Sequence, residues 1–283
     1  MRSLIFVICA LMASHSVAAS RILATSGLTQ IEGAAGGGLV PWAVIGGYGS
    51  TGEWGAAASL SRTVVSDFRL GTAAVTGGFD NRLELSFAQQ TLQVENLAEA
   101  LGTTPVDSVI EQHVFGVKAR LYGDLIYGHW PQMSVGIQHK INLNDGVGTF
   151  LGADRGYGTD YYFSASKLYL HALFERNLLL NGTLRYTDAN QTGLLGFGDE
   201  NGTDYQFMVE ASAGLLLTPE WAVGAEYRQK PDRLGTQEDD WFDVFVAWFP
   251  NKRIAVAAAW VDLGNIALWD DQQGWYLSVQ ITN

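Results

Sequence analysis

Residues 205–217 read YQFMVEASAGLLL, and apolar side chains occupy every second position of this stretch. Side chains of a β-strand point alternately to opposite sides, so a period of two predicts a strand with one apolar and one polar face. One face carries Tyr205, Phe207, Val209, Ala211, Ala213, Leu215 and Leu217, and the other carries Gln206, Met208, Glu210, Ser212 and Gly214.

The same alternation recurs along the chain. It is clearest in HVFGVKARLY (113–122), QMSVGIQHK (132–140), LLLNGTLRY (178–186) and WAVGAEYRQ (221–229). These segments are longer than the about 5 to 6 residues of a typical strand in a soluble protein. They match the about 9 to 11 residues with which a tilted strand crosses a bilayer. Length therefore favours a membrane barrel over a soluble β-sandwich.

The connections alternate between short turns and long loops. The short turns are FDNR (79–82), FERN (174–177), TPE (218–220) and PNK (250–252), and the long polar loops cover 142–160, 188–204, 231–240 and 262–273. Short turns at one end and long loops at the other are the plan of a bacterial outer-membrane barrel. Closure of the barrel also leaves no unpaired strand edge in lipid.

We predict one all-β domain over residues 20–283, a transmembrane antiparallel up-and-down β-barrel of 12 to 14 strands. Bacterial single-chain barrels have even strand numbers, so LTQIEG at 28–33 is a candidate for an additional strand. The other candidates cover 40–48, 54–65, 68–78, 82–94, 109–122, 132–141, 160–172, 178–188, 204–217, 221–230, 241–249, 253–263 and 275–283.

The first residues and the composition indicate export. Residues 1–19 combine Arg2, an apolar run and small residues at Val17 and Ala19, which predicts a signal peptide cleaved after Ala19. Cys9, the single cysteine, lies inside it, so no disulfide is expected. Charged residues make up 16% of the chain, below the about 25% of soluble domains, and 33 of the 283 residues are glycine. The net charge of −12 argues against a nucleic-acid partner.

Several stretches resemble an uncharacterised proteobacterial family of predicted outer-membrane β-barrels, a domain-of-unknown-function family. They are GLTQIEGAAGGGLVPWAVIGGYG (27–49), VFGVKARLYGD (114–124), PQMSVGIQHK (131–140), DVFVAWFPNK (243–252), VDLGNIA (261–267) and GWYLSVQ (274–280). The resemblance implies a location in the outer membrane and a barrel fold, and it implies no activity and no catalytic residues.

The polar faces of the strands carry charges of both signs. In a membrane barrel these faces line the lumen. Two interpretations stay open: the charges pair and fill a narrow interior, or they line a water-filled path and set its selectivity. The predicted lumen-lining residues are Arg82, Glu84, Lys118, Arg120, Lys140, Arg185, Glu210, Glu226, Arg228 and Asp243.

The Gly-rich stretch at 27–40 also has two interpretations. It forms either a bent first strand where the barrel closes, which we favour, or an N-terminal plug tucked into the lumen. A plugged barrel with a hydrophobic path would suit apolar solutes.

Two histidines and the acidic loops are candidate chemical sites. His113 and His139 fall on the lipid-facing register, and Ser134 and Gln138 beside them point inward, so a Ser–His lipid hydrolase is disfavoured. DENGTD (199–204) lacks the spacing to a bidentate glutamate that a calcium loop needs. We therefore expect no catalytic residue, no cofactor and no metal site. Tryptophans near strand ends are expected in two interfacial girdles; they are Trp42, Trp54, Trp130, Trp221, Trp241, Trp260, Trp269 and Trp275.

The strand GWYLSVQITN (274–283) is expected to close the barrel and to be read by the barrel-assembly machinery, although Asn283 stands where an aromatic residue is usual. The first functional hypothesis is a passive outer-membrane channel or transporter for small solutes, apolar ones included. The second is a structural or interaction barrel with a filled lumen and acidic loops, and the third is a lipid-modifying enzyme. Expected partners are outer-membrane lipid and lipopolysaccharide, which divalent cations would bridge to the acidic loops.

Overall fold

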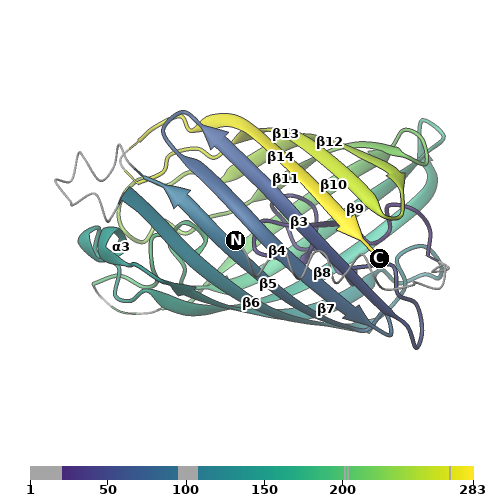
Figure 1. Cartoon of the computed structure of the whole chain (residues 1–283), viewed down its shortest axis with the longest axis horizontal. Coiled ribbons are helices and arrows are strands. Elements are labelled where there is room, and N and C mark those ends of the chain that lie inside the picture. Colours follow the sequence, from purple (N-terminus) through teal and green to yellow (C-terminus); the bar gives the residue numbers. More distant parts are fainter. Residues whose placement is uncertain (1–20, 95–107, 201, 203, 268) are drawn as a thin grey trace.

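A computed structural model of the chain describes residues 21–94, 108–200, 202, 204–267 and 269–283. The predicted signal peptide, residues 1–19, lies outside the described residues. Twelve antiparallel strands, β3 to β14, close into a barrel (Figure 1). The predicted barrel class and strand range are confirmed, with the strand number at the lower limit.

The barrel strands follow one another around the wall in chain order. Closure comes from β14 pairing antiparallel with β3, for example Tyr276 opposite Thr63. The strands are β3 (Trp54–Val65), β4 (Arg69–Phe79), β5 (Leu83–Gln93), β6 (Val109–Tyr122), β7 (Gln132–Asn142), β8 (Tyr157–Leu173), β9 (Arg176–Thr187), β10 (Gln206–Leu216), β11 (Trp221–Arg228), β12 (Trp241–Asn251), β13 (Ile254–Asp262) and β14 (Gln273–Thr282).

The alternation of the sequence becomes an inner and an outer wall. In β10, Met208, Glu210 and Ser212 are buried, whereas Phe207 and Val209 are more than half exposed. Large exposed apolar side chains recur around the outside, among them Leu60, Leu85, Val117, Val209 and Leu277. Such a surface is costly in water and suited to lipid. Among the described residues no helix is both long and apolar enough to cross a membrane; α3 (Gly146–Phe150) is a single turn in the loop after β7.

The predicted first strands at 28–33 and 40–48 are wrong as barrel strands. Only β1 (Leu28–Thr29) and β2 (Ala35–Gly36) form there, and they pair with each other in a separate two-stranded sheet. Pro41 has no N–H for a strand ladder, and the backbone of this stretch bonds instead to polar side chains of the barrel wall. Residues 25–49 are all buried, and Figure 1 shows the segment inside the outline of the barrel.

The girdle prediction is wrong for two tryptophans. Trp54, Trp130, Trp221 and Trp275 are exposed, with Trp54 72% exposed, but Trp42 and Trp241 are buried inside the barrel. Trp42 lies in the internal segment, and its indole nitrogen donates to Ser212 Oγ at 2.9 Å. Trp241 starts β12 on the inward register beside Arg228.

Candidate functional site

The lumen holds a separate stretch of chain, residues 21–49, which we call the luminal segment. The segment reverses direction at Gln30–Ala34, where the Gln30 amide donates to the Ala34 carbonyl at 2.9 Å. After this turn the chain leads to the start of β3. Arg21 ties the two limbs together, because its guanidinium donates to the Thr25 carbonyl on one limb and to the Ile45 and Gly47 carbonyls on the other.

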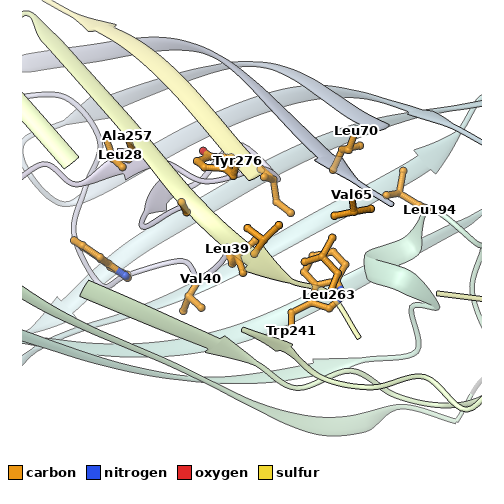
Figure 2. Close-up of a cluster of buried hydrophobic side chains, with 14 of the residues drawn as sticks. Leu28, Leu39, Val40, Val65, Leu70, Leu194, Trp241, Ala257, Leu263 and Tyr276 are labelled. Atoms are coloured by element: carbon orange, nitrogen blue, oxygen red, sulfur yellow. The ribbon is translucent and has the colours of Figure 1, made fainter. Parts of the chain in front are cut away.

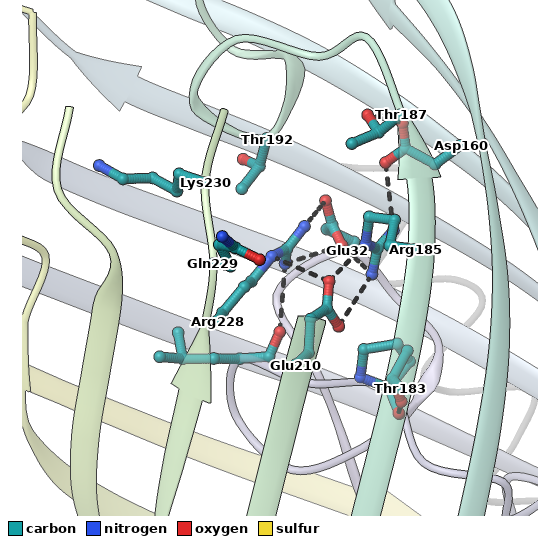
Figure 3. Close-up of polar contacts among 12 residues, drawn as sticks. Glu32, Asp160, Thr183, Arg185, Thr187, Thr192, Glu210, Arg228, Gln229 and Lys230 are labelled. Carbon is teal, nitrogen blue, oxygen red and sulfur yellow. Dashed lines mark hydrogen bonds and ion pairs between the residues drawn. The ribbon is translucent and has the colours of Figure 1, made fainter. Parts of the chain in front are cut away.

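Glu32, at the turn of the luminal segment, is surrounded by cations of the wall (Figure 3). The Arg228 guanidinium donates to both of its carboxylate oxygens at 3.0 Å. Lys140 Nζ donates to Oε1, and Arg185 Nη2 lies 3.4 Å from Oε2. All four side chains are almost completely buried. A buried carboxylate is tolerated only with such compensation.

The wall supplies the remaining charges of this network. Asp160 Oδ2 lies 2.7 Å from Lys140 Nζ and 3.1 Å from Arg185 Nη1. Glu210 pairs with Arg185, and its Oε1 lies 3.4 Å from Arg228 Nε. Three cations therefore face three anions. One of the anions, Glu32, belongs to the luminal segment, so the wall alone would hold one unmatched positive charge.

A second pair of charges clamps the luminal segment from β5 and β6. Lys118 Nζ lies 3.1 Å from Glu84 Oε1. Glu84 accepts from the Ala35 amide at 3.1 Å and the Gly46 amide at 2.8 Å. Lys118 donates to the Ala35 carbonyl at 2.9 Å and the Val44 carbonyl at 2.7 Å. The pair thus bonds to residues of the segment that are about ten apart in sequence but adjacent in space.

Glu226 on β11 holds the segment from the other side. Its Oε2 accepts from the Gly38 and Leu39 amides at 2.6 and 2.7 Å, and its Oε1 accepts from Ser212 Oγ at 2.7 Å. A Cβ on Gly37 would lie 2.0 Å from Oε1, so only glycine allows this close approach.

Neutral side chains complete the contact. The Pro41 carbonyl accepts from Thr183 Oγ1 at 2.8 Å, and the Ala43 amide donates to Ser166 Oγ at 2.8 Å. Gln132 donates to the Ala43 carbonyl at 2.6 Å. These bonds place polar atoms of β7, β8 and β9 against the backbone of the segment, which satisfies carbonyls and amides that have no strand partner.

The loop between β9 and β10 packs against luminal side chains of β7. Residues 187–198, after β9, are all buried, and the loop includes the short 3₁₀ turn η2 (Gln191–Gly193). Its Thr192 carbonyl accepts from Lys140 Nζ at 2.8 Å, and its Gly193 carbonyl accepts from Asn142 Nδ2 at 2.8 Å. Lys140 therefore bonds both to the luminal segment and to this loop.

Next to this loop, Lys230 follows β11. Its Nζ lies 3.0 Å from Glu238 Oε2 and donates to the Asn265 carbonyl at 3.0 Å. Burial lowers the pKa of Lys230, and the Glu238 carboxylate acts in the opposite direction. This contact joins the two loops that follow β11 and β13.

Buried apolar side chains gather in the lumen beside β11 to β14, together with the polar Glu226, Arg228 and Asp243 (Figure 2). The apolar inward positions of these strands are mostly small, and they pack against Leu28, Leu39 and Val40 of the luminal segment. A cavity of about 50 Å³ remains between the segment and this wall. The small inward residues are Ala222, Ala247, Ala255, Ala257 and Ala259.

The predicted lumen-lining residues do not all lie together. Arg82 stands in the turn before β5, where its side chain is 67% exposed and lies 3.7 Å from Asp80, so its prediction as a lumen residue is wrong. Strand β5 begins at Leu83, one residue later than the predicted strand 82–94, so Arg82 belongs to the turn. Arg120 is half-buried near the same end and bonds to Gly123 and Asp124 of the turn after β6. The other eight, Glu84, Lys118, Lys140, Arg185, Glu210, Glu226, Arg228 and Asp243, are buried inside the barrel.

Sequence reasoning missed Glu32 and Asp160. Glu32 is the only charged residue between Arg21 and Glu53. The ten predicted residues comprise six cations and four anions. The excess of cations among the predicted wall residues, together with the single carboxylate of Glu32 in an otherwise uncharged stretch, is the signal that could have predicted this contact. Asp160 follows the polar loop at the start of β8, where no apolar alternation marks its inward register.

The histidines lie on the outer wall. The His113 ring packs edge-on to Phe87 at 5.3 Å and lies 6.4 Å from Phe115. His139 Nδ1 lies 2.9 Å from Thr159 Oγ1. Ser134 and Gln138 are buried, on the opposite side of β7. In the acidic loop after β9, Asp199 pairs with Arg233 at 3.0 Å.

The fold and the lumen define a class: a membrane-type β-barrel of the bacterial outer-membrane kind, with an internal segment of its own chain. Within that class, the chain belongs to the family described as "Protein of unknown function (DUF3034)", whose model matches residues 25–280. No curated protein matches the chain significantly.

Solved structures with a similar fold are barrels. The structure entitled "KdgM porin" has a TM-score of 0.50 at 9% identity, covering 80% of this chain and 98% of that one. The outer membrane protein Omp33 of Acinetobacter baumannii has a TM-score of 0.47 at 13% identity, covering 82% and 99%. Outer membrane phospholipase A from Escherichia coli has a TM-score of 0.42 at 9% identity, covering 84% and 94%. At these identities the similarity shows the fold alone.

Proposed function

We propose that this protein is a gated outer-membrane channel for small solutes, and that the luminal segment is its gate. The observation that carries the proposal is that a separate segment of the chain lies in the lumen and is bonded to the wall. Ion pairs and hydrogen bonds hold this segment, and residues 50–53 connect it to the wall. A barrel with a purely structural role could fill its lumen with the inward side chains of its own strands, without a separate segment.

The apolar part of the wall of β11 to β14 supports passage of solutes with an apolar body. Small inward residues such as Ala247, Ala257 and Ala259 leave free volume on that side, next to the charged Glu226, Arg228 and Asp243 of the same wall. With cleavage after Ala19, the segment would have a free N-terminus close to Arg21, so it could leave the lumen without threading a loop. We propose no enzymatic activity, because Ser134 of β7 is buried inside the barrel, on the face opposite to the outward His139.

The second candidate is a structural barrel that presents its acidic loops. The neutral network of three cations and three anions favours it, because paired buried charges can simply fill an interior. The two candidates differ in one property: the luminal segment must move if it is a gate, and it stays in place if it only fills the lumen.

A reversible lock tests this difference. The Ala43 amide and Ser166 Oγ are 2.8 Å apart, so Ala43→Cys with Ser166→Cys brings a cysteine of the segment next to one of the wall, and a thiol count establishes whether the disulfide has formed. Conductance in planar bilayers would be measured before and after reduction, with each single cysteine variant as a control. Cys9, the one native cysteine, lies in the predicted signal peptide.

We expect the oxidised double variant to be silent and the reduced one to conduct like the wild type. Equal conductance in both states would show that solutes pass without movement of the segment. If neither the wild type, nor the reduced double variant, nor Glu32→Gln conducts, the channel is rejected and the structural barrel is supported.

A further inference from the structure

Two polar atoms that line the cavity beside the luminal segment, Asp243 Oδ1 and the Tyr276 hydroxyl, have no hydrogen-bond partner among the described residues. Almost all of the cavity lining is apolar, with Leu28 and Trp42 from the segment and Phe245 and Ala257 from the wall. Asp243, on the inward face of β12, also lines it. The Asp243 side chain is 1% exposed, and its Oδ1 has no hydrogen-bond partner among the described residues.

Asp243 and its neighbour Glu226 lack the cation partner that the other buried luminal carboxylates have in the described part of the chain. Within the part of the chain that the structure describes, Glu32, Glu84, Asp160 and Glu210 each pair with a lysine or an arginine, and no such pair involves Asp243. A buried carboxylate oxygen without a donor costs about 1–3 kcal/mol or more. That cost is removed when a ligand supplies the donor.

The neighbour of Asp243 strengthens the preference for a cation. Glu226 lies directly opposite Asp243 on β11. Its carboxylate already accepts from the Gly38 and Leu39 amides and from Ser212 Oγ. Two adjacent carboxyl groups in an apolar surrounding resist carrying two negative charges at once, and the ammonium group of a ligand would stabilise Asp243 in its ionised form.

We propose that the cavity binds a small ammonium compound, with its charged nitrogen at Asp243 and its short apolar body against Leu28, Trp42 and Phe245. The volume of about 50 Å³ limits the occupant, since a cavity of about 150 Å³ is needed for benzene. A chain of a few carbons fits this limit. The inference names the solute class of the proposed channel and therefore rests on that function, but the binding site can be tested without any flux.

The test uses the full mature chain in detergent and three matched probes: propylammonium, 1-propanol and propionate. Binding is measured by saturation-transfer NMR titration. We expect propylammonium to bind with a millimolar Kd and at least about tenfold more tightly than 1-propanol, because the neutral alcohol lacks the charge, and we expect propionate not to bind. This comparison uses only the wild type, so it holds even where a variant fails to fold.

Asp243→Asn keeps the shape of the side chain and removes its charge. We expect it to weaken propylammonium binding at least about tenfold and to leave the heat-modified gel shift of the folded barrel intact. Asp262→Asn is the matched control, because Asp262 lies at the end of β13 and bonds to Gln273 rather than lining the cavity. Equal binding of propylammonium and 1-propanol, or unchanged binding by Asp243→Asn, overturns the proposal.

The two proposals fail in different ways. Selective binding without any flux in liposome swelling would keep the site and reject the channel. Flux without selective binding would keep the channel and reject the ammonium site.

Discussion

Arg228 on β11 and Glu32 in the luminal segment face each other with two nitrogen–oxygen distances of 3.0 Å, and both side chains are buried. This pairwise geometry is the strong form of an arginine–carboxylate contact. It joins the turn of the segment to the barrel wall. Because the two residues are 196 positions apart in sequence, the contact exists only when the barrel has closed around the segment.

Glu32→Gln is predicted to loosen the segment while the barrel still folds. Removing one partner of a buried ion pair costs about 3–5 kcal/mol, because the remaining charges stay buried. If that cost falls on the closed state, the ratio of closed to open molecules falls about 100-fold or more. Planar-bilayer conductance should therefore rise. Asp270→Asn, which removes an exposed loop carboxylate, should leave the conductance unchanged. A Glu32→Gln variant with the conductance of the wild type would argue against a gate.

Glu32→Gln combined with Lys140→Met is predicted to be less harmful than the two single changes together. The single changes leave the network with an excess of positive or of negative charge, whereas the double variant restores equal numbers. Contacting residues in one network typically show coupling of about 0.5–3 kcal/mol. Urea unfolding of the four proteins in liposomes measures it. Additive effects would mean that Glu32 and Lys140 do not share a charge balance.

Gly37→Ala is predicted to displace Glu226 from the segment. The new Cβ would lie 2.0 Å from Oε1, so the carboxylate must leave the Gly38 and Leu39 amides. Overpacking of this kind costs about 1–3 kcal/mol. Conductance should increase as for Glu32→Gln. Gly182→Ala is the control, since its Cβ would meet nothing within 4 Å. An equal change of conductance in the two alanine variants would show that the contact with Glu226 does not hold the segment.

The sequence predicts the wall of this barrel well because the wall obeys a local rule. Each inward side chain, such as Lys118 or Glu210, is placed by its parity in a strand, and parity can be read within a few residues. The misassigned Arg82 lies one residue outside its strand, where parity no longer determines direction.

The luminal segment follows no local rule. Its glycines fit a bent strand as well as a plug, and the choice depends on acceptors and donors that β5, β6, β8 and β11 supply from far along the chain. Glu32 and Asp160 join one network only through the closure of the barrel. The unused carboxylate of Asp243 was likewise invisible, because its lack of a partner is a property of the assembled lumen.

The outer wall yields a prediction about depth in the bilayer. Leu60 lies in the middle of β3, between Val279 of β14 and Ala73 of β4, and is 54% exposed. Leu83 begins β5 at the short-turn end and is 52% exposed. The two leucines are thus equally accessible and differ in their position along the barrel.

Arginine on the lipid face costs about 2–4 kcal/mol at the bilayer midplane and about 0–1 kcal/mol near the interface. Leu60→Arg should therefore destabilise the protein in liposomes by several times more than Leu83→Arg, with Leu60→Ala and Leu83→Ala as the matched controls for lost side-chain volume. Urea unfolding, followed by the gel shift of the folded barrel, measures both. In water the two arginine variants would behave alike, so equal destabilisation in liposomes would mean that this apolar wall does not face the core of a membrane.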